Sequence, residues 1–167
     1  MGNAQLSAHT APNDAAVAAV PMRFEVTEVP VADVDRARAF YQSLGWRLDA
    51  DFPMDDHARV VQFTPPGSPA SIIVGKGTTS MTPGSVQDRM LVVDDIDAAR
   101  EELISRGVDV SEVWHDESGI YHHAGTEGRV PGPGGERGSY KTWASFTDPD
   151  GNAWVLQEVK ERLPGRV

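Results

Sequence analysis

The sequence predicts an α+β fold made of two tandem βαβββ modules whose curved mixed sheets surround a cleft. The first observation behind this prediction is an internal repeat, because segment 31–38 returns 62 positions later as segment 93–100. The identical positions at this offset are 31/93, 33/95, 35/97, 37/99, 38/100, 43/105 and 45/107. Two copies are too few for a solenoid, so the repeat indicates one pseudo-symmetric domain.

The second observation is that both copies carry the same helix signals. Asp33 stands at the N-cap position of an expected helix, and Gly45 stands where a C′ glycine ends one. Asp95 and Gly107 repeat this arrangement in the second copy. The apolar stripes of the two helices are Val34, Ala37, Tyr41 and Leu44, then Ile96, Ala99 and Leu103.

Alternating, β-rich segments surround each helix, with one before it and three after it. In the first copy, the expected strands cover 23–31, 46–50, 59–64 and 71–74. In the second copy, they cover 89–93, 108–113, 142–147 and 153–159.

The domain organisation follows from these elements. Segment 1–21 has little apolar content, so we expect a flexible N-terminal tail. A single domain then spans 22–160, with module 1 at about 22–75 and module 2 at about 87–160, followed by a C-terminal tail at 161–167. The second copy holds a long Gly/His/Pro-rich loop at about 114–140, which suggests a lid or a binding loop.

Composition excludes several classes of protein. The net charge of −10 disfavours nucleic acid and anionic membranes as partners. The absence of cysteine excludes disulfides and thiolate chemistry. No apolar stretch approaches the roughly 20 residues that span a bilayer, and no secretory signal is evident, so we expect a cytoplasmic protein.

Three short motifs give the sequence a family resemblance. They are Ala39-Phe40-Tyr41 with Leu44-Gly45, then Val93-Asp94-Asp95-Ile96-Asp97, and above all segment 146–152 (Phe-Thr-Asp-Pro-Asp-Gly-Asn) followed by Leu156-Gln157-Glu158. Over residues 22–160 the chain resembles the vicinal oxygen chelate superfamily, which contains glyoxalases, bleomycin-resistance proteins and extradiol dioxygenases. The resemblance implies the glyoxalase/bleomycin-resistance fold and a homodimer, but this fold serves many activities.

The resemblance also implies a divalent metal (Fe, Mn, Ni, Zn or Mg) held by the first and last strands of each copy. Counting from Asp33, Asp95, Gly67 and Gly151 places Val26, Asp88, Val74 and Glu158 at these positions. Asp88 and Glu158 are therefore the candidate metal ligands, whereas Val26 and Val74 cannot bind a metal. Glu28, His115, His122 or His123 would have to complete the site.

The alternative is that no metal binds, and that Val26, Glu28 and Val74 line a pocket for a ligand. Trp114, Tyr140 and Trp143 lie around the long loop and could stack on a planar ligand. Glu158 and His122 are the candidate catalytic residues. Arg129 and Arg137 flank a Gly-Pro segment, where an arginine could hold a carboxylate.

Two functions therefore remain open from the sequence. The first is a protein that binds a small planar or oxygen-rich metabolite or an antibiotic, with an incomplete metal site. The second is a divalent-metal-dependent lyase, isomerase or dioxygenase that acts on vicinal oxygens. In both cases the partners are a small molecule and a second copy of the chain.

Overall fold

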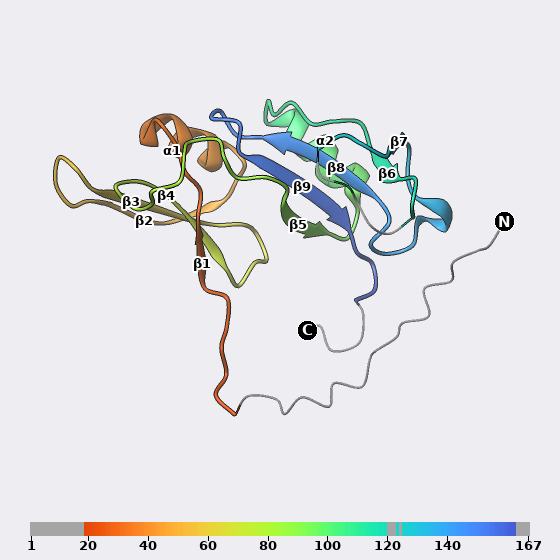
Figure 1. The fold of residues 1–167 in the computed structure, drawn as a ribbon, viewed down its shortest axis with the longest axis horizontal. Coiled ribbons are helices and arrows are strands. Elements are labelled where there is room, and N and C mark those ends of the chain that lie inside the picture. Colours follow the sequence, from red (N-terminus) through yellow and green to blue (C-terminus); the bar gives the residue numbers. More distant parts are fainter. Residues whose placement is uncertain (1–18, 120–122, 124, 163–167) are drawn as a thin grey trace.

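A computed structural model describes residues 19–119, 123 and 125–162 of the chain (Figure 1). The helices are α1 (Val34–Ser43), α2 (Ile96–Ser105) and the short 3-10 helix η1 (Gly135–Arg137). The strands are β1 (Val26–Glu28), β2 (Arg47–Pro53), β3 (Arg59–Thr64), β4 (Ser71–Lys76), β5 (Arg89–Val93), β6 (Trp114–Asp116), β7 (Arg129–Pro131), β8 (Trp143–Thr147) and β9 (Ala153–Glu158).

The strands form two sheets that repeat one topology, as the sequence predicts. Sheet 1 has the order β1-β4-β3-β2, and sheet 2 has the order β5-β9-β8-β6-β7. In each sheet the first strand runs parallel to the last strand of its module, and the other pairs are antiparallel. The two βαβββ modules of an α+β fold are thus confirmed.

Two strands differ from the sequence-based expectation. The first strand is confined to β1, shorter than the expected 23–31. Segment 108–113 is not a strand, because only Val110 bridges Phe146 there, and β6 takes the neighbouring place in sheet 2. The long loop at 114–140 is itself partly ordered, since it contains β6, β7 and η1.

Both helices begin at the predicted caps. The Asp33 side chain accepts a hydrogen bond of 3.0 Å from the backbone N–H of Arg36, and Asp95 does the same for Ala98 at 3.0 Å. Gly45 follows α1 with a φ of +78°, a conformation that glycine adopts without strain. Within the described part of the chain, no helix has the length and apolar character of a membrane-spanning segment.

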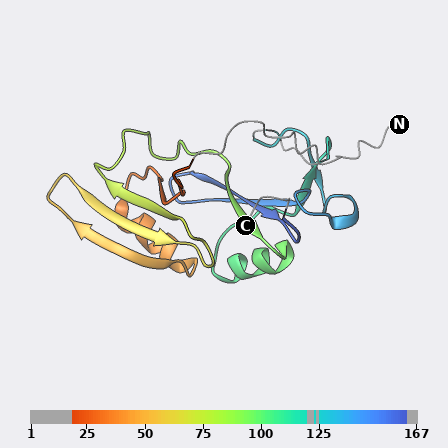
Figure 2. The same cartoon turned by 90° about the horizontal axis from the view of Figure 1, so that it is seen from below.

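Each helix covers one face of its own sheet, so each sheet has a helix face and an opposite, open face. Helix α1 packs on β3 and β4, and α2 packs on β8 and β9 (Figure 2). A single apolar core on the helix faces joins the modules, and Trp154 lies at its centre with its ring 5.3 Å from that of Trp46. Its largest fully buried members include Tyr41, Phe63, Ile96 and Trp154.

A buried polar cluster also joins the modules, and it accounts for two of the sequence motifs. The Tyr41 hydroxyl of α1 donates a 2.9 Å hydrogen bond to the Asp148 carboxylate. Asn152 donates to the same carboxylate at 2.7 Å and to the Pro30 carbonyl at 2.8 Å, and it accepts from the Val86 N–H at 3.2 Å. Burial and the adjacent Asp148 carboxylate raise the pKa of Tyr41 well above its usual range, so its hydroxyl remains a donor.

Candidate functional site

The open face of sheet 2 carries exposed apolar side chains on β5, at the start of rows that cross the sheet. The strand registers place Met90, Val155 and Ser145 side by side across β5, β9 and β8. The next row contains Val92, Gln157 and Trp143. Met90 and Val92, on the edge strand β5, are 41% and 43% exposed, and exposed aliphatic side chains of this kind can mark an interaction surface.

A polar cavity of about 370 Å³ adjoins this row at the end where β5 begins. Its described lining consists of Gln87, Asp88, Asp109, Ser111, Gly125, Thr126, Arg129, Ser145, Phe146, Thr147 and Ala153. Arg129 is the single basic residue among them. The cavity thus places one cation beside hydroxyl groups and two carboxylates, next to an apolar surface.

Contacts on two sides hold Arg129 in place. Its Nη1 donates a 3.1 Å hydrogen bond to the Ser145 hydroxyl, and its guanidinium carbon lies 4.1 Å from the centre of the Trp114 ring. Trp114 in turn stacks on Trp143 at 5.2 Å between ring centres. Burial lowers the pKa of Arg129, and Asp88 acts in the opposite direction.

A second cavity of about 350 Å³ lies between segment 65–69 and the β5–α2 region. Its walls include Leu44, Trp46, Leu103 and Leu156, and also Met90 and Val92 of the edge strand β5, with Glu102 and Arg162 as the charged members. This groove belongs to the junction between the modules. It lacks the concentration of hydroxyl groups that lines the first cavity.

The loop that follows β6 is fastened beside the polar cavity by a buried carboxylate. Asp116 is 1% exposed and accepts hydrogen bonds from the N–H and hydroxyl of Ser118 and from the N–H and Nδ1 of His123, the last at 2.7 Å. Burial alone would raise the pKa of Asp116, but these hydrogen bonds outweigh it and lower the pKa. The same contact raises the pKa of His123.

The His123–Asp116 ion pair predicts a pH-dependent loop. The contribution of His123 is complete below the imidazole pKa of the unfolded chain, and it is lost as pH rises through the raised pKa of the folded protein. The contribution of Asp116 is lost at acid pH, as pH falls through its lowered pKa. NMR titration of His123 is expected to give a midpoint above the ordinary 6.5, and Asp116→Asn is expected to lower that midpoint. Equal midpoints in the two proteins would contradict this contact.

The predicted pocket residues of sheet 1 do not share a face. Val26 pairs with Ser71 and lies on the open face, 38% exposed, whereas Val74 is fully buried in the core beneath α1. Glu28 lies on the open face as expected, and its partner in β4 is Ile73. Val74 therefore lies on the opposite face of sheet 1 from Val26 and Glu28, and Ile73 is the β4 residue that lies beside Glu28.

The predicted metal ligands Asp88 and Glu158 are also separated. Glu158 pairs with Val93 at the end of β5, while Asp88 precedes the first residue of that strand, so about 16 Å of strand lies between them. The Glu158 side chain is 1% exposed and accepts a 3.3 Å hydrogen bond from the Ile96 N–H at the start of α2. It lies on the helix face, which is the face opposite to the Arg129 cavity.

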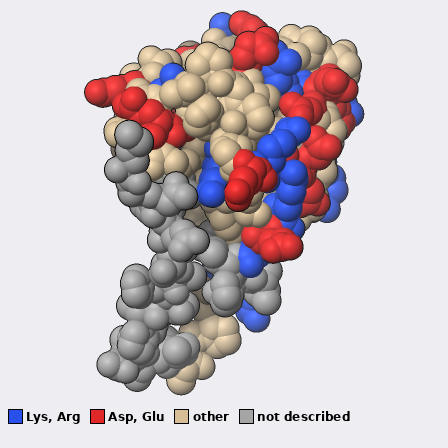
Figure 3. Space-filling view, turned by 90° about the vertical axis from the view of Figure 1, so that its right-hand side faces the viewer, with Lys and Arg blue, Asp and Glu red and all other residues tan. Residues whose placement is uncertain are grey.

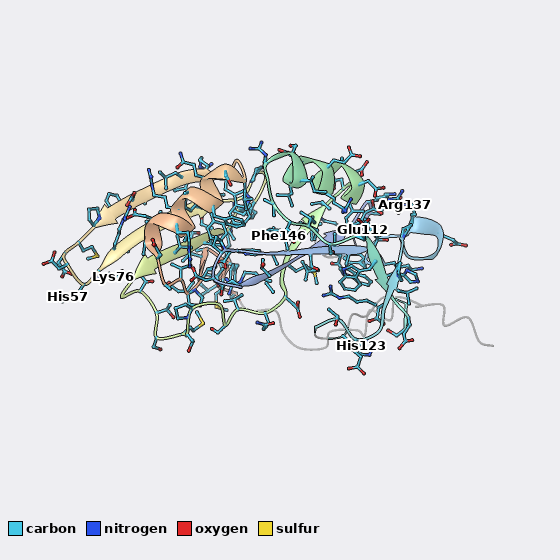
Figure 4. The ribbon with its side chains drawn as sticks, turned by 90° about the horizontal axis from the view of Figure 1, so that it is seen from above. His57, Lys76, Glu112, His123, Arg137 and Phe146 are labelled. Atoms are coloured by element: carbon cyan, nitrogen blue, oxygen red, sulfur yellow. The ribbon has the colours of Figure 1, made fainter. Side chains whose placement is uncertain are left out.

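The donors among the described residues do not fit a divalent metal. Among the described residues, no three His, Asp or Glu side chains come together in a way that could hold an ion. His115 Nδ1 lies 2.9 Å from the Gly132 carbonyl, and His57 and His123 lie at opposite ends of the molecule (Figure 4). Within the described segments, the side chains facing Glu28 and Met90 across the last strands are Ile73 and Val155, which cannot bind a metal.

The aromatic candidates lie near the cavity, but Trp114 and Trp143 are buried behind Arg129 and do not line the cavity themselves. Trp114 and Trp143 are 4% and 0% exposed and pack with Val155 on the open side of sheet 2. Tyr140 precedes β8, and its N–H donates to the Glu158 carbonyl at 2.9 Å. His122 lies outside the described residues.

Of the two arginines noted in the sequence, only Arg129 lines the cavity. Arg137 forms an ion pair of 2.5 Å with Asp97 of α2. Sequence reasoning missed Ser145 and did not distinguish Arg129 from Arg137. The alternation of β8 was the available signal, since Phe146 in the core assigns Ser145 to the open face.

The surface beside the site carries both signs of charge. On the face that Figure 3 shows, Lys and Arg side chains alternate with Asp and Glu, and no single-sign area dominates. We expect such a surface to exert little long-range attraction on a polyanion.

Comparison with known proteins gives a family and several similar structures. Residues 23–156 match the Glyoxalase/Bleomycin resistance protein/Dioxygenase superfamily. The antibiotic binding protein TnmS3 from Streptomyces sp. CB03234 is similar at 30% identity, with a TM-score of 0.61 over 86% of this chain and 99% of that one. No curated protein matches.

Two further solved structures show the same likeness. A glyoxalase/bleomycin resistance protein, also from Streptomyces sp. CB03234, is 31% identical, with a TM-score of 0.59 over 81% of this chain and 100% of that one. A member of the same superfamily from Sphaerobacter thermophilus DSM 20745 is 25% identical, with a TM-score of 0.59 over 83% and 98% of the two chains.

Proposed function

The chain belongs to the Glyoxalase/Bleomycin resistance protein/Dioxygenase superfamily, and we propose that it binds a small oxygen-rich metabolite or antibiotic on the open face of sheet 2. The observation that carries this proposal is the exposed Met90, which shares a strand row with the cavity residue Ser145 beside Arg129. Binding sites for small molecules combine an apolar wall with a few placed polar groups. The similarity to an antibiotic binding protein supports the same function.

The same face supports a homodimer. Two of its apolar side chains are well exposed, Met90 at 41% and Val92 at 43%. Covering them with a second copy would remove apolar area from water and close the ligand site. Sedimentation velocity is expected to show a dimer that Val92→Lys weakens; a monomer at all concentrations would contradict this part of the proposal.

The ligand proposal is tested with a panel of planar aromatic acids, phenols and quinones, screened by saturation-transfer NMR. At least one class is expected to bind, and Met90→Lys is expected to reduce its affinity at least about tenfold by placing a charge on the apolar row. Ile104→Lys is the matched control, because Ile104 is 44% exposed but lies on α2. No binding by the whole panel, or equal losses in both variants, would contradict the proposed site.

The superfamily also implies a divalent metal, and metal-dependent lyase, isomerase or dioxygenase activity is the alternative function. The described donors do not fit, because Glu158 lies beneath α2 and Asp88 lies at the other end of β5, where no group of three His, Asp or Glu side chains forms among the described residues. We therefore expect Mn²⁺, Ni²⁺, Zn²⁺ and Fe²⁺ to leave the melting temperature unchanged. A stabilisation by any of these ions that Asp88→Ala abolishes would contradict this expectation and restore the metal-dependent alternative.

A further inference from the structure

We propose that the ligand is an amphiphilic monocarboxylate, and that Arg129 holds its carboxylate. This inference rests on the proposed function and names the chemical class for the same site. It follows from the charge, position and support of one side chain. Three observations carry it.

The first observation is that Arg129 is a partly buried cation with no ion-pair partner among the described residues. Its Nε is buried and donates no hydrogen bond to any group within the described segments. No carboxylate of the described residues lies within 4.0 Å of its guanidinium, in contrast to Arg137 with Asp97 and Arg59 with Asp51. A buried cation is costly unless an anion compensates it, so the ligand is the natural source of that anion.

The second observation is that the guanidinium is held in position before any ligand arrives. The Trp114 ring covers one face of the guanidinium at 4.1 Å, and Trp143 supports Trp114 from behind. The Ser145 hydroxyl receives the Nη1 hydrogen at 3.1 Å. A planar fork fixed in this way loses little entropy on binding a carboxylate and matches its two oxygens.

The third observation is the character of the surrounding walls. Ser111, Ser145 and Thr147 bring hydroxyl groups to the cavity. The Ser111 hydroxyl already donates to the Glu112 carbonyl, and the Ser145 hydroxyl donates to Ser111. Thr147 is therefore the hydroxyl that can donate to a carboxylate oxygen. Met90 lies in the same strand row as Ser145 and is 41% exposed, so it offers an apolar surface for the remainder of the ligand. The site therefore fits a molecule with one acidic end and one apolar body.

Two acids in the lining limit the charge that the site accepts. Asp88 and Asp109 both line the cavity, and Asp88 is near enough to oppose the burial effect on Arg129. Asp109 is exposed to solvent, so screening weakens its effect, whereas Asp88 is only half exposed. A second negative charge on the ligand would face Asp88 without a cation of its own, so the site selects a monoanion.

Calorimetric titration with 2-naphthoate and its neutral counterpart 2-naphthamide tests the proposal. The acid is expected to bind the wild-type protein about tenfold more tightly than the amide, because charged hydrogen bonds to arginine are the stronger ones. Arg129→Gln is expected to remove this difference by weakening the acid alone. Asp88→Asn is expected to strengthen binding of the acid about threefold, since it removes a like charge.

Two further variants keep the result interpretable. Arg137→Gln is the matched control, because Arg137 already pairs with Asp97, and it is expected to leave both affinities unchanged. If Arg129→Gln does not fold, Arg129→Lys keeps the charge without the planar fork and is expected to lower affinity for the acid about threefold.

The possible failures are distinguishable. Equal affinities for the acid and the amide in the wild-type protein, or a preference for the acid that is undiminished in both Arg129 variants, would overturn the carboxylate assignment and leave the proposed function standing. Failure of every neutral and acidic compound in the aromatic panel would contradict the proposed function as well.

Discussion

Asn152→Ala is expected to lower the free energy of unfolding by about 3 kcal/mol or more, because it leaves several buried polar groups without partners. Asn152 is completely buried and bonds to the Pro30 carbonyl, the Val86 N–H and the Asp148 carboxylate. Pro30 belongs to module 1 and Asp148 to module 2. The substitution therefore breaks a connection between modules as well as individual hydrogen bonds.

Urea denaturation followed by circular dichroism measures this effect. Gln42→Ala on the exposed surface of α1 is the matched control and is expected to change stability by less than about 0.5 kcal/mol. The loss of stability in Tyr41→Phe is expected to lie between those of Asn152→Ala and Gln42→Ala, because it removes the hydroxyl that bonds to Asp148 but keeps the ring in the core. Similar stabilities for Asn152→Ala and Gln42→Ala would show that this cluster does not hold the modules together.

Glu158→Ala is expected to lower the free energy of unfolding by about 2 kcal/mol while leaving ligand affinity unchanged in the folded protein. The carboxylate accepts a hydrogen bond from the Ile96 N–H at the first turn of α2. It also lies 3.6 Å from the Lys160 ammonium and 3.9 Å from the Arg137 guanidinium. Removal of the Glu158 carboxylate leaves the Ile96 N–H at the start of α2 without its acceptor and creates a small void among buried groups.

This expectation differs from the role that the sequence suggests for Glu158. If Glu158 were a metal ligand or a catalytic residue, its substitution would reduce ligand binding or turnover, with little change in the free energy of unfolding. Glu101→Ala, on the exposed surface of α2, is the control and is expected to be nearly neutral. Loss of ligand binding by a stable, folded Glu158→Ala protein would contradict the structural role and return Glu158 to the site.

The sequence predicts the architecture well because the signals for the fold are local and occur twice. Asp33 and Asp95 cap helices in both copies through the same side-chain contact. The Tyr41 and Asn152 motifs, far apart along the chain, meet at Asp148. Repetition of one topology in sheets 1 and 2 follows from the repetition of these signals.

The site is predicted less well because the face of a strand changes with every residue. The count from Gly67 ends on Val74, whose side chain lies in the core. The neighbouring residue Ile73 is the one whose side chain lies on the open face. The same alternation along β9 puts Glu158 on the helix face and Val155 on the open face. A motif identifies which strand contributes to the site. Only the register with the neighbouring strand identifies which side chain of that strand faces the ligand.

The role of Arg129 is also difficult to predict from the sequence, because it depends on contacts between segments that lie far apart along the chain. Its position depends on Trp114 of β6 and Ser145 of β8, and the loop that precedes it is fastened at Asp116. None of these contacts follows from a motif or a periodic pattern. Arg129 and Arg137 look equivalent in the sequence, and only their contacts distinguish them.

Chemical-shift mapping of backbone amides during a titration with 2-naphthoate tests most directly whether the open face of sheet 2 is the binding site. Shifts are expected at Met90, Arg129, Ser145 and Val155, the residues of the apolar row and the polar cavity. Shifts confined to segment 65–69 and α2 would place the ligand in the groove between the modules and contradict the account given above.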